Sequence, residues 1–394
     1  MSDPIIIVGA GLSALRTAES LRKNGYAGPI RVFGDEPHRP YNRPPLSKQA
    51  LIEGIQADAL AFPLRASVDD VEFELGAEVV SCDLAAASVT TADARTHSMS
   101  GLVAASGIRP RQLPIPGPQD GRVLLRTIED ALRLREELAG GIRLVILGSG
   151  FIGCEVAATA RALGCEVDVV SLDSEPMIRP LGSDLGAGMR AHHEQHGVRF
   201  HLGRTITEFT GRERVTGALL DDGRRLQADL VLEAVGSVAN TDWLEGNGLD
   251  LSNGVLTDEY LSIVGSPVPA VAVGDVARHP NALFPGELMR IEHWNMPTEM
   301  GKRAGATLAS MVTGESLAGK PFDALPSFWS DQYDINLQSF GVPGSASSYE
   351  LTEGSYEGDC IVEYHDATGL IGVIGVNRTA ELMPYRKALL AREP

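Results

Sequence analysis

Two stretches of the chain share one order of apolar and polar positions. Residues 4–22 (PIIIVGAGLSALRTAESLR) and residues 143–173 (RLVILGSGFIGCEVAATARALGCEVDVVSLD) each begin with a continuous apolar run, pass a glycine-rich turn and continue at helical spacing. A short apolar run bounded by a turn predicts a strand buried on both faces, and the periodic segment after it predicts a helix. The pattern therefore predicts two strand-turn-helix units in an α/β protein.

The turns have the spacing of dinucleotide-binding turns, GxGxxA in the first unit and GxGxxG in the second. The first glycine permits the tight turn, the second lets the backbone approach a pyrophosphate, and the third small residue lets the helix pack closely on the strand. The helix N-terminus then presents free N–H groups to the phosphates. These residues are Gly9, Gly11 and Ala14 in the first unit and Gly148, Gly150 and Gly153 in the second.

An acidic residue completes the first unit. The next apolar run, PIRVFGDE, predicts a strand that ends at Glu36, whose carboxylate can accept hydrogen bonds from a ribose diol. A coincidental tight turn does not explain a strand, a helix and an acid in this order. Because one chain carries two such units, we expect two nucleotides that exchange a hydride, one of them permanently bound.

Later apolar runs predict how the chain is divided. GLVAASGIRP (101–110) and DLVLEAVGSVANT (229–241) have similar character at the two ends of the second unit, and PAVAVGDVA predicts a buried strand ending at Gly274 and Asp275. Taken alone, Asp275 is as consistent with a turn cap as with a hydrogen bond to a cofactor hydroxyl. We expect two Rossmann-like domains and a C-terminal α+β domain, with limits 1–110 plus 238–319, 111–237, and 320–394.

The stretch YNRPPLSKQ predicts an unusually stiff corner. Pro44 and Pro45 fix two φ angles and remove two backbone donors, and Pro44 disfavours the helical region for Arg43. We therefore expect an extended segment, flanked by the cations Arg43 and Lys48 in an otherwise acidic chain.

Charge and cysteine content narrow the function classes. The 394 residues include 52 acidic and 34 basic ones, a net charge of −18, which argues against a nucleic-acid partner. Cys82, Cys154, Cys165 and Cys360 have no metal-ligand or disulfide spacing, so we expect reduced thiols. The N-terminus shows no signal-like pattern and its apolar run is too short to span a bilayer, so we expect a cytoplasmic protein without membrane contact.

An ordered set of motifs carries a family resemblance along nearly the whole chain. The segments GAGLSAL, GDEPHRPYNRPPLSK, GIRPRQLPIPG, LRTIEDA, GSGFIGCEVAA, AVGDVA, IEHW and FWSDQYD occur in this order. The chain thereby resembles the FAD-dependent, NAD(P)H-dependent reductases of small iron-sulfur carriers, namely the ferredoxin reductases of bacterial cytochrome P450 and aromatic-ring dioxygenase systems, and rubredoxin reductases. These belong to the pyridine nucleotide-disulfide oxidoreductase superfamily but lack its redox disulfide.

The resemblance implies that the first unit holds FAD. The helix after IEHW would aim its N-terminus at the pyrimidine end of the flavin, where its dipole favours negative charge. The residues implied to bind FAD are Gly9, Gly11, Ala14, Glu36, Arg43, Lys48, Ala105, Ser106, Gly107, Arg126, Asp275 and Trp294.

The second unit would bind NAD(P)H through its glycine turn and Glu155. At the end of the next strand this chain has Ser171 where its relatives mostly place a Glu that grips the adenosine ribose. No Arg or Lys follows directly, and Asp173 and Glu175 would repel a 2′-phosphate, so we expect NADH, with NADPH left open.

The resemblance also suggests catalytic residues. Lys48 and Glu155 would meet beside flavin N5, as a pair that either supports hydride transfer or is purely structural. Trp329 would lie between the flavin edge and a docked iron-sulfur protein, or would fill a domain interface.

The segment HHEQH raises the question of a metal site. His192 and His196 stand one helical turn apart, but the sequence offers no evident third ligand. The segment, including His193, predicts a solvated helix end that stops at Gly197, and we expect no metal there.

Alternatives differ in the electron acceptor. Disulfide and peroxide reductases need a cysteine beside the flavin, and there is none between Met1 and Val80. A [2Fe-2S] ferredoxin is the expected partner, and a rubredoxin is not excluded. A redox-sensing NADH-binding flavoprotein of apoptosis-inducing-factor type is the alternative from another class. The sequence does not determine the oligomeric state.

Overall fold

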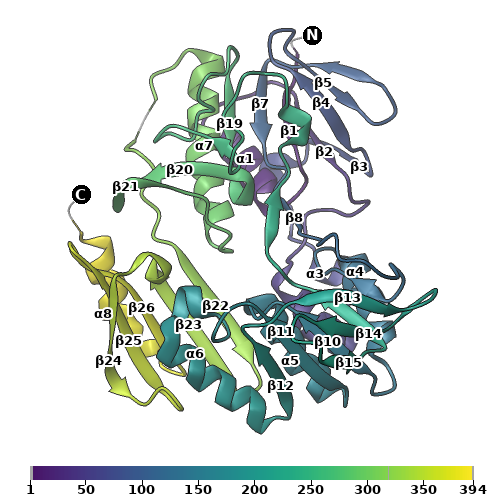
Figure 1. Cartoon of the computed structure of the whole chain (residues 1–394). Coiled ribbons are helices and arrows are strands. Elements are labelled where there is room, and N and C mark those ends of the chain that lie inside the picture. The colour runs from purple at the N-terminus through teal and green to yellow at the C-terminus, as the bar shows by residue number, and fades with distance from the viewer. Residues whose placement is uncertain (1–2, 318, 393–394) are drawn as a thin grey trace.

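Two parallel sheets carry the two glycine-rich units, and an antiparallel sheet forms the third part of the molecule (Figure 1). The computed structural model describes residues 3–317 and 319–392. The first sheet has the order β19 (Ala270–Ala272), β7 (Gly101–Ala104), β1 (Ile5–Val8), β2 (Ile30–Gly34) and β3 (Glu72–Leu75), with every neighbouring pair parallel.

Two helices from distant parts of the sequence cover this sheet. Helix α1 (Leu12–Lys23) follows the first glycine turn, and α7 (Met296–Thr313) packs against it. Ala14 of α1 and Leu308 of α7 are fully buried in the same core as β1. The chain therefore returns to its first unit after it has built the second.

The second sheet has the order β12 (Val198–Leu202), β11 (Glu166–Ser171), β10 (Arg143–Leu147), β16 (Leu230–Glu233) and β9 (Arg122–Val123), again parallel. Alternate residues of β10 face opposite cores. Leu144 and Ile146 pack with α4 (Ile128–Leu138) and α5 (Phe151–Ala162). Val145 and Leu147 pack with the meander β13 (Ile206–Gly211), β14 (Val215–Leu220) and β15 (Arg225–Gln227).

The C-terminal part is a five-stranded antiparallel sheet with one helix, which agrees with an α+β unit. Its order is β22 (Ser327–Gln332), β23 (Ile335–Gly341), β26 (Gly369–Val376), β25 (Cys360–Asp366) and β24 (Ser348–Gly354), followed by α8 (Met383–Leu390). Phe328 and Tyr364 of this sheet share a core with Leu181 of α6 (Ile178–Gln195), so the sheet packs directly on the second unit.

Smaller elements connect these parts. The strands β8 (Ile108–Pro110) and β17 (Ser237–Ala239) pair where the chain passes between the first two units. Two three-stranded sheets flank the first unit, and two short helices follow the proline segment. No helix in residues 3–317 and 319–392 is long and apolar enough to cross a membrane. The remaining elements are β4 (Val79–Asp83), β5 (Ser88–Thr91), β6 (Thr96–Ser98), β18 (Val255–Leu256), β20 (Ala277–Asn281), β21 (Phe284–Met289), α2 (Gln49–Glu53) and α3 (Ala57–Leu60).

The structure corrects the expectation of an extended segment at the two prolines. Residues Pro44–Ser47 form a 3-10 helix, and Arg43 before it has helical angles, φ −83° and ψ −31°. Proline is well tolerated in the first turn of a helix because its missing N–H has no partner there. The hydrogen bond from Leu46 N to Arg43 O at 2.9 Å outweighs the steric bias against a helical residue before proline.

Two strand boundaries and the burial of one histidine also differ from the sequence expectation. Strand β2 ends at Gly34, before Glu36, and β19 ends at Ala272, with Gly274–Val276 forming a 3-10 turn. The helix end at HHEQH is not wholly solvated, because the side chain of His193 is fully buried. The burial of His193 involves a distant segment, because its Nε2 contacts Gln332 Oε1 at 2.7 Å, which a local pattern does not contain.

Candidate functional site

The two glycine turns have the same geometry. Gly9 has φ +104° and Gly148 has φ +108°, and a Cβ atom on either would lie 2.2 Å from a carbonyl oxygen of the neighbouring strand connection. Gly11 and Gly150 differ from them, because a Cβ there would meet nothing within 4 Å. Their backbone therefore faces open space at the start of a helix, where a pyrophosphate can approach the free N–H groups.

The third position of each turn is a packing position. Gly153 lies so close to its strand that a Cβ would stand 2.3 Å from Gly148 O. Ala14 is fully buried at the corresponding place in α1. Both therefore support the site from behind rather than line it.

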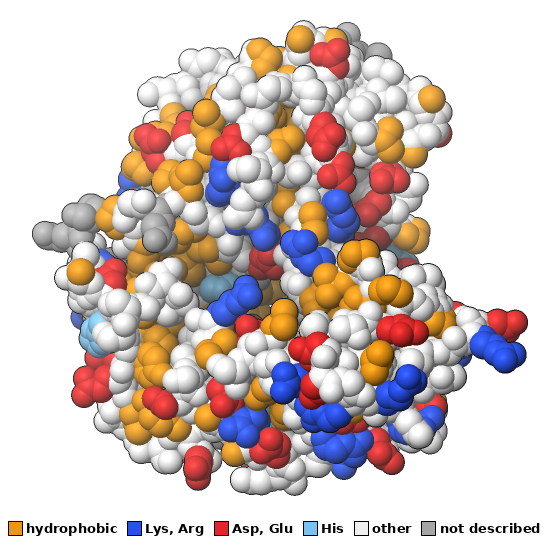
Figure 2. All heavy atoms as spheres, in the orientation of Figure 1, with side chains coloured by type: hydrophobic (Ala, Val, Ile, Leu, Met, Phe, Trp, Pro, Cys, Tyr) orange, Lys and Arg blue, Asp and Glu red, His pale blue; other side chains and the backbone are white. Residues whose placement is uncertain are grey.

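Both open turns face one cavity of about 900 Å³. Figure 2 shows the surface hollowed at the centre of this face, where cationic, acidic and histidine side chains gather between the upper and lower parts. The volume lies at the upper end of the range of roughly 300–1,000 Å³ for ligand pockets. Of the predicted site residues, those that line it are Gly9, Gly11, Glu36, Arg43, Lys48, Ala105, Ser106, Gly107, Arg126, Gly150, Glu155, Asp275, Trp294 and Trp329.

Glu36 and Arg43 form one network at the cavity wall. Arg43 pairs with Glu36, and its Nη1 donates to Tyr41 Oη and to Arg126 O, both at 2.8 Å. Tyr41 Oη donates to Glu36 Oε2 at 2.6 Å, and burial raises the pKa of Tyr41. Tyr41 is a site residue that the sequence reasoning missed, although it stands inside the proline stretch. The network fixes the carboxylate and the guanidinium where the first unit would hold a nucleotide.

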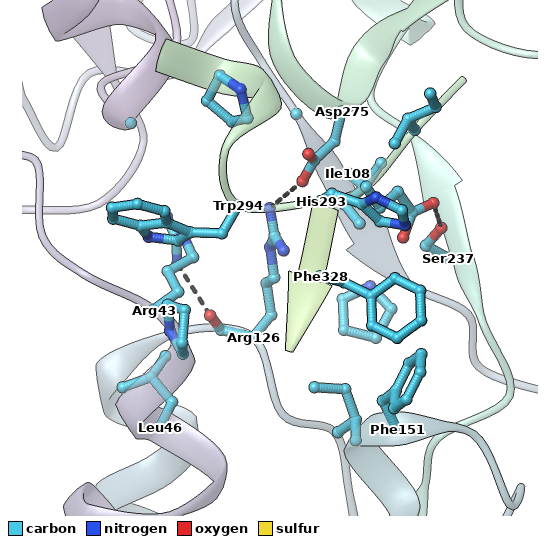
Figure 3. A pocket seen from close by; sticks show the side chains of 18 of the residues that line it. Arg43, Leu46, Ile108, Arg126, Phe151, Ser237, Asp275, His293, Trp294 and Phe328 are labelled. Atoms are coloured by element: carbon cyan, nitrogen blue, oxygen red, sulfur yellow. Dashed lines mark hydrogen bonds and ion pairs between the residues drawn. The ribbon is translucent and has the colours of Figure 1, made fainter. Parts of the chain in front are cut away.

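A second ion pair crosses the cavity. Arg126 Nη2 donates to Asp275 Oδ2 at 3.2 Å, and Figure 3 shows the guanidinium extended from the loop before α4 toward this carboxylate. Burial raises the pKa of Asp275, and the charge of Arg126 opposes that rise. Asp275 therefore lines the cavity, where its oxygens can accept hydrogen bonds from a ligand hydroxyl.

Lys48 and Glu155 are in direct contact between the two units. Lys48 Nζ donates to Glu155 Oε1 at 2.9 Å, and their side chains are 12% and 6% exposed. Ser47 Oγ and Ser330 Oγ also donate to this carboxylate, the latter at 2.7 Å. Glu155 thus accepts from three donors on two parts of the chain, the proline segment and β22, which fixes its position and satisfies its charge. Sequence reasoning missed Ser330, because only the fold brings β22 to α5.

Two tryptophans stand at the edge of the cavity. The rings of Trp294 and Trp329 meet edge to face at 5.6 Å, and Trp294 Nε1 donates to Asn42 Oδ1 at 2.8 Å. Trp294 is 40% exposed and Trp329 is partly exposed. Trp329 therefore presents part of its aromatic surface to the cavity.

Aromatic side chains on the opposite wall were not predicted. Phe151 and Phe328 pack with ring centroids 4.9 Å apart, and His293 stands edge-on to Phe328 at 5.1 Å (Figure 3). Burial lowers the pKa of His293 to about 4, so it is neutral at neutral pH. Its Nδ1 has no hydrogen-bond partner among the described residues. His293 and Phe328 belong to the motifs IEHW and FWSDQYD, which was the available signal.

Ser171 and Asp173 lie outside the lining of the cavity, at the end of β11. Ser171 is buried and its Oγ accepts from Ser149 Oγ at 2.9 Å and from Asp173 N at 3.2 Å. Two nearby arginines are engaged by carboxylates: Arg190 pairs with Glu175, and Arg204 pairs with an aspartate. Because both arginines near this strand end are paired with carboxylates, neither is free to bind the 2′-phosphate of NADPH, and this disfavours NADPH.

The cysteines are buried thiols. Cys82, Cys154, Cys165 and Cys360 are unpaired, and none of them lines the cavity. Burial raises the pKa of Cys82 to about 12 and that of Cys360 to about 11, so their thiolates are not populated near pH 7. No thiol relay is therefore available at this site.

The cavity fits a flavin dinucleotide together with a nicotinamide nucleotide. Two turns leave open space where pyrophosphates would lie, the carboxylates of Glu36 and Asp275 line the cavity, and one buried imidazole nitrogen lacks a partner among the described residues. Aromatic walls and a lysine-glutamate pair occupy the space between the two turns.

Two family models match the chain. The model described as pyridine nucleotide-disulphide oxidoreductase matches residues 3–301, and the one described as reductase C-terminal matches residues 327–394. The chain belongs to the pyridine nucleotide-disulphide oxidoreductase family. The C-terminal part, which the second model matches, contributes Trp329 of β22 to the cavity wall.

Known members of the family resemble the chain over its full length. Rhodocoxin reductase of Rhodococcus erythropolis is 34% identical over 99% of this chain and 90% of its own. The ferredoxin–NAD(+) reductase component of the p-cumate 2,3-dioxygenase system of Pseudomonas putida is 35% identical over 97% and 92%. A crystal structure of the covalent putidaredoxin reductase–putidaredoxin complex matches with a TM-score of 0.91 at 30% identity, over 99% of this chain and 94% of that one.

Proposed function

We propose that the protein is an NADH-dependent flavoprotein reductase that passes electrons through FAD to a small iron-sulfur protein, a [2Fe-2S] ferredoxin that serves a P450 or Rieske oxygenase. One observation carries this proposal. Two dinucleotide turns open into one cavity whose wall offers a lysine, carboxylates and aromatic rings, while the four thiols lie elsewhere. Electrons that enter such a site must leave from the flavin itself, toward an external acceptor.

We assign the first unit to FAD and the second to NADH, with the domain limits 1–110 plus 238–319, 111–237, and 320–394. The Glu36 network and Asp275 would hold the ribose and ribityl hydroxyls, and the backbone at Gly11 would face the FAD pyrophosphate. The backbone at Gly150 would face the NADH pyrophosphate. We infer a reducing compartment, the cytoplasm, from the four free thiols.

FAD, when bound, accepts two electrons as a hydride and releases them one at a time. The chain supplies the surroundings for this chemistry. Lys48 and Glu155 fix a charge pair between the two nucleotide subsites, which orients groups on both. Phe151 and Phe328 form an apolar wall that excludes water from the region between the subsites.

The exposed aromatic edge is suited to electron transfer out of the cavity. Trp294 and Trp329 stand where the cavity meets the surface, so an acceptor protein docking there would approach the flavin without entering the NADH subsite. The relatives described above act with small redox proteins, and this chain has the same three-part organisation.

The proposal is tested by NADH-driven reduction of cytochrome c with and without added carrier proteins. We expect a low rate without carrier and a rate that rises and saturates as a [2Fe-2S] ferredoxin is added. A response to rubredoxin alone would change the carrier class. A slow oxidase that no carrier accelerates would contradict a reductase and would favour a redox sensor.

A further inference from the structure

A cluster of potential metal ligands lies outside the lining of the nucleotide cavity, where the C-terminal end of α6 meets the turn between β22 and β23. His192 and His196 stand one helical turn apart, and Asp334 belongs to the turn. One ligand atom from each of these three residues lies within 4.8 Å of the others. His192 Nε2 is 3.0 Å from Asp334 Oδ1. The sequence pattern showed only two of these ligands, because the third comes from another part of the chain.

Contacts with other groups, apart from Asp334, help to orient the two imidazoles. His196 Nδ1 donates to His192 O at 2.9 Å, so its Nε2 carries the lone pair that a metal ion requires. The His196 ring stacks on Tyr333 with centroids 3.9 Å apart and planes at 16°. His192 Nε2 is shielded from solvent and makes no hydrogen bond of good geometry with any described residue, although the carboxylate is near. This unsatisfied nitrogen is what a bound cation would engage.

We propose that His192, His196 and Asp334 bind one divalent transition-metal ion of the zinc type, with water completing the coordination shell. Two imidazoles and a carboxylate are ligands that such ions accept. With bonds of about 2.0–2.2 Å, tetrahedral ligand atoms stand about 3.3 Å apart, so the cluster must contract slightly. Asp334 can make that movement, because its side chain is 80% exposed.

The ion would join two parts of the molecule. His192 and His196 belong to the second dinucleotide unit, whereas Asp334 belongs to the C-terminal sheet. These parts already share an apolar core that includes Leu181 and Phe328. A metal ion at the edge of this core would stabilise the junction, because it binds only when both parts are in place.

The junction leads to the nucleotide cavity through a buried chain of hydrogen bonds. His193, next to one ligand, contacts Gln332 Oε1 through Nε2 at 2.7 Å. Gln332 Nε2 donates to Ser330 Oγ at 3.0 Å, and Ser330 Oγ donates to Glu155 at 2.7 Å. The turn that the ion would fix therefore follows the strand that positions Glu155.

The site is tested with the FAD-loaded full-length protein, prepared without a histidine tag and treated with a chelator that is then removed. Zn²⁺ is titrated in competition with a chromophoric zinc indicator. We expect one tight site per chain, and a melting temperature that rises with added Zn²⁺. His196→Ala and Asp334→Asn should each weaken binding by about tenfold or more and abolish the rise.

A matched control is His365→Ala. His365 also pairs with a carboxylate, at 3.1 Å from Glu363, but without a second histidine ligand, so its loss should leave the tight site unchanged. X-ray absorption of the zinc-loaded protein should show two imidazoles with oxygen ligands. The proposal is overturned if Asp334→Asn or His196→Ala binds Zn²⁺ as tightly as the unmodified chain, or if the unmodified chain has no tight site.

Discussion

Lys48 and Glu155 form an ion pair between the two dinucleotide units. The carboxylate is buried, and its three donors come from the proline segment and from β22. Such a pair can be purely structural, or it can position the nicotinamide and the flavin for hydride transfer. A structural role predicts that replacing Lys48 leaves the rate of hydride transfer unchanged, whereas a positioning role predicts that this rate falls.

We predict that Lys48→Ala slows reduction of the flavin by NADH, on the order of 10- to 100-fold. The substitution removes the ion pair with Glu155 that would orient the nicotinamide and the flavin for hydride transfer. The measurement is anaerobic stopped-flow at saturating NADH with flavin-replete protein. Lys302→Ala is the matched control, since Lys302 pairs with Glu299 on the exposed side of α7. An unchanged rate in Lys48→Ala would leave the pair a structural role only.

A substitution of Trp329 can distinguish electron transfer to the acceptor protein from reduction of the flavin by NADH. Its ring lines the cavity beside Trp294 and is partly exposed, so it can contact an acceptor protein. We predict that Trp329→Ala slows electron transfer to the ferredoxin while the rate of flavin reduction by NADH stays within about twofold. Equal transfer rate and equal ferredoxin affinity in the variant would remove Trp329 from the proposed docking edge.

At the scale of elements, the glycine turns were predictable because their chemistry is local. A tight turn, an open backbone and a close helix are all encoded within a few consecutive residues, and the structure shows each of them. The 3-10 helix at Pro44 and the burial of His193 were not predictable in this way. The 3-10 helix rests on the hydrogen bond from Leu46 N to Arg43 O, which opposes the local bias against a helical residue before proline. The burial of His193 depends on a segment distant in the sequence, as its contact with Gln332 shows.

The two glycines of the second turn should respond differently to substitution. A Cβ at Gly150 meets no protein atom within 4 Å, so Gly150→Ala should fold normally but raise KM for NADH by about tenfold, since the methyl group occupies pyrophosphate space. A Cβ at Gly148 would lie 2.2 Å from Ala234 O, so Gly148→Ala should lower the melting temperature. Thermal melting and steady-state kinetics on both variants check this. Wild-type KM in Gly150→Ala would argue against NADH binding at this turn.

A buried histidine on β20 should make the stability of the fold depend on pH. His279 is 1% exposed, and burial lowers the pKa of its imidazole. In the unfolded chain this imidazole takes up a proton below about pH 6.5, whereas in the folded chain burial opposes protonation. The contribution of the neutral imidazole to the stability of the fold is therefore complete above that pH and declines as the pH falls below it. We predict a shallower fall of melting temperature between pH 7.5 and pH 5 in His279→Gln. The slope would not vanish, because His293 is also buried and neutral. An identical slope in both proteins would contradict this assignment.

At the scale of the whole molecule, function depends on three parts meeting at one cavity. The first unit contributes Glu36 and Asp275, the second contributes Glu155, and the C-terminal sheet contributes Trp329. The order of motifs along the chain predicted these parts, and most of the site residues named from it line the cavity. It could not predict Ser330 as a partner of Glu155, or Asp334 as a neighbour of two histidines, because these contacts arise only when the C-terminal sheet packs on α6.

In the proposed function, electrons from NADH leave the flavin for a small iron-sulfur protein. The most direct measurement reduces the FAD-loaded protein anaerobically with one equivalent of NADH and mixes it with an oxidised [2Fe-2S] ferredoxin in a stopped-flow instrument. We predict flavin reoxidation at a rate that increases with ferredoxin concentration, with two ferredoxins reduced per FAD. Flavin that reoxidises no faster with ferredoxins or rubredoxin than in buffer alone would contradict the account.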